Sequence, residues 1–241
     1  MNTLYKHTLQ LAILASLAGP VLAQADHAAA PRKDTTSSAD KQAASASRHV
    51  NDAVAVVHKL EMEDSMRPLI AAAKGVFVIP SYGRAAAGIG ADGGTGILLA
   101  RRADGSWAEP VFYTTGGLSV GLQAGAQGGT VAFVLNNQKA IDVFLKKTSV
   151  SLNASAGLTV LNWNKMVEKT AGAGDVVAWS DTKGLFGDVA TVEVSGIRFN
   201  QKLNNAYYHR TLSATDVIDG KASNPQSQLL VRTITAAAAN P

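Results

Sequence analysis

A block paced by glycine residues, Ala73 to Asn136, most constrains what this chain can fold into. Val76 to Ile79 is a short β-branched and aromatic run that ends at Pro80. Asp92-Gly93-Gly94 and Asp104-Gly105 are signals at which a chain reverses easily. The block therefore predicts three strands joined by tight turns, and it contains no recognisable catalytic centre.

Alternation of apolar residues with small or polar ones predicts further strands beyond this point, because a half-buried strand has one face of each kind. The alternating or continuously apolar runs are Leu118–Ala126, Val131–Leu135, Val150–Val160, Val176–Ser180 and Ala190–Phe199. In the last run the apolar parity switches at Gly196, which predicts a β-bulge. The alternation favours antiparallel pairing.

Helical spacing and capping residues predict helices around these strands. The predicted helices run from about Val50 to Glu63, from about Ser65 to Lys74 with a left-handed cap at Gly75, from Asn137 to Lys146-Lys147, for one turn after Ser213 with Asp216, and onward from Asn224-Pro225. The predicted fold is a single α+β domain: a mainly antiparallel sheet, barrel- or sandwich-like, with N-terminal helices, one mid-chain helix and short C-terminal helices.

The first 23 residues have the pattern of a cleavable export signal, with Lys6 before an apolar stretch. Cleavage is predicted between Ala23 and Gln24; the alternative is a retained N-terminal anchor. Residues 24–47 are rich in small and charged residues, which predicts a flexible or loosely helical spacer before a domain at 48–241. With no cysteine, the chain has no lipobox thiol and no disulfide. We expect an exported protein, periplasmic or secreted.

The charge balance is only weakly basic, with 22 Lys and Arg side chains against 18 Asp and Glu. One of these bases, Lys6, belongs to the signal. A small surplus favours anionic partners, but the clustered basic stripe of a nucleic-acid-binding protein is missing, so nucleic acid is not an expected partner.

Two short motifs match enzyme patterns without their structural context. Gly88 to Gly93 fits the dinucleotide pattern G-x-G-x-x-G, but a strand follows where a helix is required, which favours a hairpin turn. Gly117 to Gly121 fits G-x-S-x-G, but Ser119 lies within a strand pattern, and downstream only His209 is available as a base. A serine hydrolase centred on Ser119 stays an alternative.

Metal ligands are not predicted either. The histidines show no pair at the spacing i and i+4, and the acidic group Glu61, Glu63 and Asp64 fits an exposed helix end better than a calcium site. We therefore expect no metal and no other cofactor.

Six ordered segments resemble one protein family. They are AKGVFVIP (73–80), GIGADGGTGILLAR (88–101), DGSWAEPVF (104–112), GGLSVGLQAGAQ (116–127), SDTKGLFGDV (180–189) and NAYYHRTLSATDVIDGK (205–221). In this order they are similar to the SYLF domain family, a lipid-binding module of fungal and animal actin-patch proteins with many secreted bacterial relatives. Where family members often carry an acidic residue before an apolar strand, this chain has Gly129-Thr130.

The resemblance implies membrane and phosphoinositide binding in eukaryotic members and actin binding in some fungal ones. An exported protein would meet neither actin nor, ordinarily, phosphoinositides. What carries over is the domain and a lipid- or membrane-associated role.

Lipid headgroups are bound by Lys and Arg side chains, with exposed apolar residues entering the interface. The candidate lipid-binding residues are Arg84, Arg101, Arg102, Lys146, Lys147, Lys183, Leu185 and Phe186. The cations could equally be ordinary solvated caps or strand edges, and Leu185 with Phe186 could either present apolar tips to a membrane or plug the end of the sheet.

The leading hypothesis is a non-enzymatic, exported module that binds anionic lipid or another envelope component. The alternatives are an interaction or structural module that docks an envelope protein, and the hydrolase at Ser119.

Overall fold

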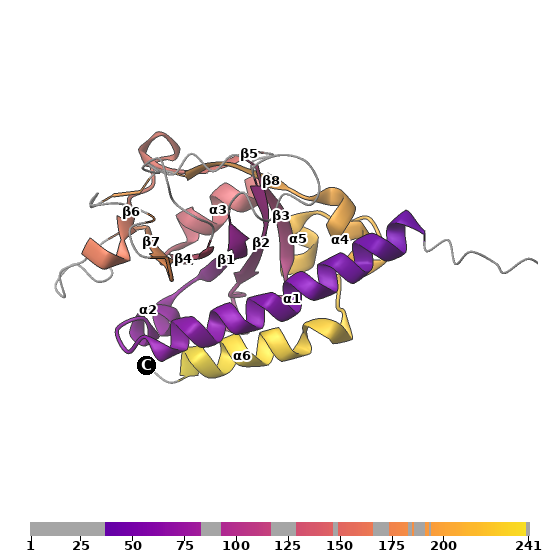
Figure 1. Cartoon of the computed structure of the whole chain (residues 1–241), viewed down its shortest axis with the longest axis horizontal. Helices are drawn as coiled ribbons and strands as arrows, with labels where there is room; N and C mark the ends of the chain where they lie inside the picture. The colour runs from indigo at the N-terminus through magenta and orange to yellow at the C-terminus, as the bar shows by residue number, and fades with distance from the viewer. Residues whose placement is uncertain are drawn as a thin grey trace, which may run out of the picture. The chain divides into compact units, whose positions relative to one another are not determined.

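One mixed β-sheet organises the part of the chain that the structure describes (Figure 1). The computed structural model describes residues 37–82, 93–116, 129–146, 149–165, 174–182, 185, 191–192 and 194–239. Within them, the sheet has the strand order β5-β8-β3-β2-β1-β4-β7-β6. Its strands are β1 (Gly75–Tyr82), β2 (Gly93–Ala100), β3 (Val111–Gly116), β4 (Gly129–Leu135), β5 (Ser149–Leu152), β6 (Val160–Asn162), β7 (Val176–Ser180) and β8 (Val194–Phe199). The predicted α+β class is confirmed.

Strand β1 lies at the centre of the sheet, antiparallel to both β2 and β4. Phe77 pairs with Leu98 on one side and with Phe133 on the other. Its ring contacts Phe144 at 4.9 Å and Tyr113 at 5.9 Å between centroids. The aromatic group centred on Phe77 is fully buried and forms much of the core.

The two outer strands are close neighbours in the sequence, which forces the sheet to curve. Only residues 153–159 connect Leu152 at the end of β5 to Val160 at the start of β6. Eight extended residue steps span at most about 28 Å, whereas a flat sheet of eight strands would measure about 34 Å across. The connection can therefore be made only because the sheet is nearly barrel-like in its curvature.

The single strand predicted from Val150 to Val160 is therefore wrong. The chain leaves the sheet in a 3-10 turn, η2 (Ala154–Ala156), where the side chain of Asn153 accepts a hydrogen bond from the backbone of Ala156 at 3.0 Å. Gly157 follows with a φ of 73°. The chain then enters β6, which pairs with β7 in parallel. The local alternation of residues 150–160 could not reveal that the two halves of this segment belong to opposite edges of the sheet.

Helix α1 (Ser38–Met62) begins well before the predicted start near Val50. Ser37 and Asp40 form a capping box that closes the N-terminus of the helix, and Ala46 is fully buried. Residues 38–47 are thus helical and part of the folded unit, which corrects the spacer boundary predicted at Ser47.

Helix α2 (Arg67–Ala72) has Pro68 in its first turn, as predicted, but Gly75 is not its cap. Gly75 starts β1, where a Cβ atom would lie 2.5 Å from Cδ1 of Ile141 and 2.9 Å from the carbonyl oxygen of Leu99. Glycine is required there by the close approach of neighbouring elements.

Helix α3 (Gln138–Lys146) is capped by Asn137, whose side chain accepts from the backbone N–H of Ala140 at 3.1 Å, as predicted. The predicted bulge in β8 is also confirmed: Gly196 has a φ of 81°, and the register with β5 shifts there.

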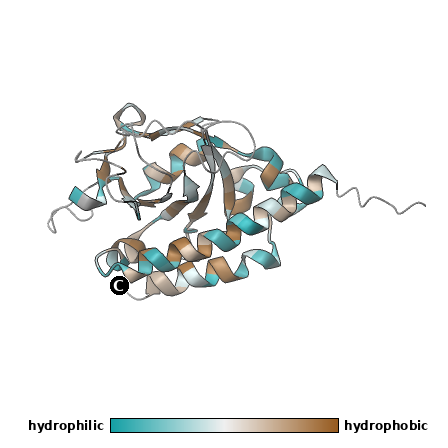
Figure 2. Cartoon of the chain, in the orientation of Figure 1, coloured by the Kyte–Doolittle hydropathy of each residue, from teal (hydrophilic) through white to brown (hydrophobic). Residues whose placement is uncertain are grey.

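The C-terminal helices are α4 (Gln201–Tyr208), α5 (Ala214–Ile218) and α6 (Gln228–Ala239), with the 3-10 turn η5 (Pro225–Ser227) before α6. Helix α4 has no counterpart among the sequence predictions, although Asn200 caps it and buried Leu203 and Tyr207 are four residues apart. Helix α6 lies alongside α1 (Figure 1). Figure 2 shows apolar residues along the strands and at intervals on α1 and α6, as expected for helices with one buried face.

No helix in the described residues is both long and apolar enough to cross a bilayer.

Candidate anion-binding site

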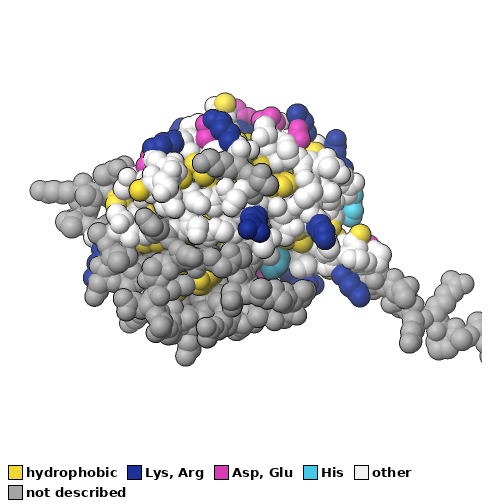
Figure 3. All heavy atoms as spheres, turned by 90° about the horizontal axis from the view of Figure 1, so that it is seen from above, with side chains coloured by type: hydrophobic (Ala, Val, Ile, Leu, Met, Phe, Trp, Pro, Cys, Tyr) yellow, Lys and Arg dark blue, Asp and Glu magenta, His cyan; other side chains and the backbone are white. Residues whose placement is uncertain are grey.

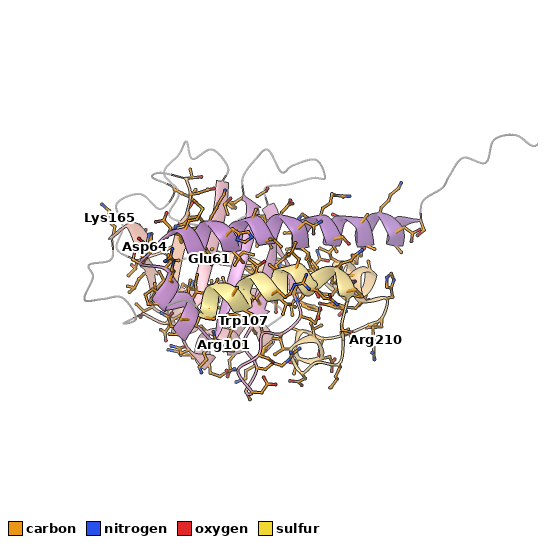
Figure 4. The ribbon with its side chains drawn as sticks, turned by 90° about the horizontal axis from the view of Figure 1, so that it is seen from below. Glu61, Asp64, Arg101, Trp107, Lys165 and Arg210 are labelled. Carbon is orange, nitrogen blue, oxygen red and sulfur yellow. The ribbon has the colours of Figure 1, made fainter. Side chains whose placement is uncertain are left out.

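The predicted arginine pair lies where β2 ends, and the two side chains have different surroundings. Arg101 forms a bridge with Trp107 across the Asp104-Gly105 turn, and its guanidinium lies 4.9 Å from the centre of the Trp107 ring. Its Nε and Nη2 atoms are buried without a hydrogen-bond partner in the described residues. Figure 4 shows Arg101 and Trp107 next to each other. Arg101 is thus mainly an interior stacking residue.

Arg102 connects the β2–β3 corner to the end of α5. Its Nε donates to the carbonyl oxygen of Ile218 at 2.7 Å, and its Nη1 donates to the carbonyl oxygen of Trp107 at 3.2 Å. A third bond, of 3.4 Å, joins Nη1 to Oγ of Ser106. No carboxylate of the described residues forms an ion pair with it, so its charge is held by neutral acceptors.

A hollow of about 220 Å³ lies beside this arginine. We call it the basic hollow; its lining residues are Tyr208, Arg210, Gly220, Lys221, Ala222 and Ser223. Gly220 joins it to Arg102, because a Cβ atom at Gly220 would lie 3.7 Å from Nη2 of Arg102. Two cationic side chains, Arg210 and Lys221, therefore line the hollow, and Arg102 lies next to Gly220 in its wall without lining it.

Local structure fixes the walls of the basic hollow. Helix α4 ends at His209 in the left-handed conformation, with a φ of 52°, and Arg210 follows it. Helix α5 starts at the predicted capping box of Ser213 with Asp216 and is followed by Asp219 and Gly220, whose φ is 82°. The chain turns sharply at both places, and so brings residues 208–210 next to residues 220–223.

Hydrogen bonds hold this arrangement together. Nη1 of Arg210 donates to the carbonyl oxygen of Lys221 at 3.0 Å, and the buried Tyr208 hydroxyl donates to the carbonyl oxygen of Pro110 at 2.6 Å. Burial raises the pKa of Tyr208 well above its usual value, so this hydroxyl remains a neutral donor.

The carboxylates near the basic hollow are partly neutralised. Nζ of Lys221 lies 2.7 Å from Oδ1 of Asp216. The hydrogen bonds from Lys221 and then from Ser213 hold the pKa of Asp216 well below its usual value, while the bond to Asp216 raises the pKa of Lys221. Lys221 is thus already paired, whereas Arg102 and Arg210 have no carboxylate partner among the described residues.

Lys146, another predicted cation, forms an ion pair with Asp142 one turn earlier in α3. Asp142 also accepts a hydrogen bond from Gln138 at 2.9 Å. The bonds from Lys146 and then from Gln138 lower the pKa of Asp142. Lys146 is therefore exposed but paired on its own helix. Figure 3 shows one face of the molecule, and the basic side chains of the described residues on that face stand singly rather than as one continuous patch.

Leu185 is buried, with 1% of its surface exposed, so it is not an apolar tip in contact with solvent. Its backbone N–H donates to the carbonyl oxygen of Thr182 at 3.2 Å. For this residue the structure favours the plug alternative. The remaining candidates, Arg84, Lys147, Lys183 and Phe186, lie outside the described residues, as do Ser119, Gly88 to Asp92 and the predicted strand Leu118–Ala126.

A second polar cluster lies where β4 begins and β7 ends; it consists of Lys59, Thr130 and Asp181. Nζ of Lys59 in α1 donates to Oδ2 of Asp181 at 2.6 Å, and the backbone N–H of Thr130 donates to Oδ1 at 2.8 Å. Burial raises the pKa of Asp181, but the bonds from Lys59 and Thr130 outweigh it, so the pKa lies below its usual value. This cluster ties α1 to β4 and β7.

Sequence reasoning missed Arg210 and Lys221. Their only local signal was the pair of turns at His209 and Gly220, because the hollow that they line forms only when residues 208–210 and 220–223 come together in the folded chain. Among the described residues, no group of three or more potential metal ligands comes together.

Comparison with known proteins supports the family resemblance. Residues 116–237, just over half of the chain, match the Ysc84 family model, described as Las17-binding protein actin regulator. The chain is 28% identical over 137 residues to the SH3 domain-containing protein PJ696.02 of Schizosaccharomyces pombe, an alignment that covers 55% of this chain and 32% of that protein. It is 28% identical over 163 residues to the SH3 domain-containing YSC84-like protein 1 of Bos taurus, covering 65% and 46%.

A third relative is Protein YSC84 of Saccharomyces cerevisiae, 26% identical over 137 residues, with 55% of this chain and 29% of that protein covered. The chain thus spans less than half the length of these relatives. The predicted resemblance to the SYLF domain family is confirmed, and the chain belongs to the Ysc84 family.

Proposed function

We propose that this protein is a non-enzymatic, exported module that binds anionic lipid surfaces. The observation that carries the proposal is the basic hollow, which is lined by Arg210 and Lys221 and has Arg102 next to Gly220 in its wall. Guanidinium groups held by neutral acceptors keep their charge available to an anion. Membership of a family whose members include lipid-binding proteins favours the same ligand class.

Export is a separate part of the proposal and rests on the signal-like pattern of residues 1–23. Mass spectrometry of the protein recovered from an expressing bacterium tests it. A chain that begins at Gln24 supports export with cleavage; a chain that keeps residues 1–23 contradicts cleavage.

Flotation with vesicles tests lipid binding, using the processed protein from the same preparation. Vesicles of phosphatidylcholine alone are compared with vesicles that also contain phosphatidylglycerol, at low and at high salt. We expect binding to the anionic vesicles only, and its loss at high salt, because the screening length falls from about 10 Å at 0.1 M to about 3 Å at 1 M. Equal binding to neutral vesicles, or none to either kind, would contradict the proposal.

A protein partner is the second candidate function. The matched family is described by its binding to another protein, Las17. If the protein floats with neither kind of vesicle, an envelope protein becomes the better candidate for its partner. Cross-linking in intact cells followed by mass spectrometry would identify that protein.

A further inference from the structure

We infer that the sheet closes into a barrel at one weak seam and that the barrel opens there first. The seam consists of Val160 and Leu161 of β6 on one side and of Thr191 and Val192 on the other. Opening at this seam exposes apolar side chains while the rest of the sheet stays paired. This behaviour goes beyond the proposed lipid binding and does not depend on it.

The strands form a closed ring of neighbours. Each strand in the order β8-β3-β2-β1-β4-β7-β6 pairs with the next one. Leu161 of β6 forms an antiparallel bridge with Thr191, and the backbone N–H of Val192 donates to the carbonyl oxygen of Val160 at 2.9 Å. Because residues 191 and 192 lie just before β8 in the sequence, they join the last strand of this ring to the first.

The seam has the weakest pairing of the ring within the part of the chain that the structure describes. Strands β1 and β4 are paired continuously from Gly75 with Leu135 to Ile79 with Val131. At the seam, the described residues contribute one bridge and one backbone hydrogen bond. A region with few backbone bonds opens locally at a lower free energy than the centre of a sheet does. The seam therefore opens before the other strand pairs.

Apolar side chains are buried at the seam. Val160 is 2% exposed and Val192 is 3% exposed. In the closed barrel, the exposed large apolar side chains of the described residues are Met62 and Leu229, which belong to the helices α1 and α6. Opening of the seam therefore uncovers apolar surface that the closed sheet hides, and it gives β6 a free edge.

Hydrogen exchange in the unmodified protein tests the seam directly. NMR compares the exchange rate of the Val192 amide with the rates of the amides in β1 and β4, each corrected for its intrinsic rate. We expect the Val192 amide to exchange at least tenfold faster than these amides, but more slowly than in an unfolded chain, because it is hydrogen-bonded. Exchange as slow as in β1 and β4 would overturn opening at the seam, and exchange at the unfolded rate would overturn the closure.

A disulfide across the seam provides a second test. The chain has no cysteine, so the double variant Leu161→Cys/Thr191→Cys can form only this disulfide within one molecule. The hydrogen bond from Val192 to Val160 makes Leu161 and Thr191 a non-hydrogen-bonded pair. Cα atoms of such a pair lie about 4.5 Å apart, within the range of about 4.4–6.8 Å that a disulfide allows. Leu161 is half-buried and Thr191 is exposed, so both substitutions leave the buried valines in place.

The oxidised and reduced forms of the double variant are matched controls for each other. We expect oxidation to slow exchange at Val192 at least tenfold and to slow the amides of β1 and β4 less. The single variants Leu161→Cys and Thr191→Cys should not respond to the same treatment. If the disulfide does not form in a double variant whose circular dichroism matches that of the parent protein, the barrel is not closed at this place. Equal exchange at Val192 in the two forms would overturn opening at the seam.

Discussion

Arg102 and Ile218 are 116 positions apart in the chain, yet Nε of Arg102 donates a 2.7 Å hydrogen bond to the carbonyl oxygen of Ile218. This bond joins the β2–β3 corner to the last turn of α5. It also places Nη2 of the same arginine beside Gly220. One side chain therefore joins two distant parts of the fold and lies next to the wall of the basic hollow.

Substitution Arg102→Gln should lower the free energy of unfolding by about 1–2 kcal/mol, because it leaves two backbone carbonyls without their charged donor. Urea unfolding followed by tryptophan fluorescence measures the change. Arg232→Gln, which removes an exposed arginine, should change the same quantity by less than about 0.5 kcal/mol. Equal effects of the two variants would contradict a supporting role for Arg102.

Arg101→Met should leave the stability unchanged or raise it by up to about 1 kcal/mol. The variant loses the contact with Trp107 but removes two buried nitrogens that have no partner, and replacing the partly buried guanidinium with an apolar side chain of similar length avoids their desolvation. Trp107→Ala should instead cost about 3–5 kcal/mol, since Trp107 is buried. Thermal unfolding compares the two; a large loss in Arg101→Met would show that its charge is needed.

Gly96→Ala should destabilise the sheet by about 1–3 kcal/mol, because the added methyl group would lie 2.1 Å from Cζ of the Phe77 ring. In a Phe77→Leu background the cost of the same change should be smaller, since the clashing ring is gone. A double-mutant cycle in urea measures the difference. Equal costs in both backgrounds would mean that another contact determines the role of Gly96.

Asp181 should make stability depend on pH in the acid range. Its pKa is lowered in the folded state from an ordinary value of 3.8, so the unfolded chain binds the proton more tightly. The stabilisation is thus complete above the ordinary pKa and is lost as the pH falls through 3.8 towards the folded value. We expect Asp181→Asn to be less stable than the parent protein at pH 7, and the difference to shrink as the pH falls below 3.8. A constant difference across urea titrations at several pH values would contradict this assignment.

The central sheet could be predicted because its signals are local. The apolar run at Val76 to Ile79, the Asp104-Gly105 turn and the capping residue Asn137 each determine the structure of their own neighbourhood. The same holds for the bulge at Gly196.

The predictions were wrong where a contact between residues far apart in the sequence determines the local structure. Residues 150–160 alternate like one strand, but β5 pairs with β8 and β6 with β7, and neither partner is visible in the local pattern. Gly75 has the position of a helix cap and is instead required by the approach of Ile141 and Leu99.

The candidate site was predictable only in part, for the same reason. Arg101 and Arg102 stand out as a pair next to a turn, but which one stacks inside and which one lies beside the basic hollow depends on Trp107 and Ile218. Arg210 lines the basic hollow only because the turns that follow α4 and α5 lie next to each other.

The pairing of β5 and β6 with later strands also limits when the protein can fold during synthesis. Strand β6 has no partner until the ribosome has added β7, and β5 has none until it has added β8. Helix α1 can pack against α4 and α6 only after these later helices have been made. A nascent chain stopped after β4 exposes both edges of a four-stranded sheet, which favours association with other chains. Folding therefore completes only after the last helix has been made, although the four central strands can pair earlier.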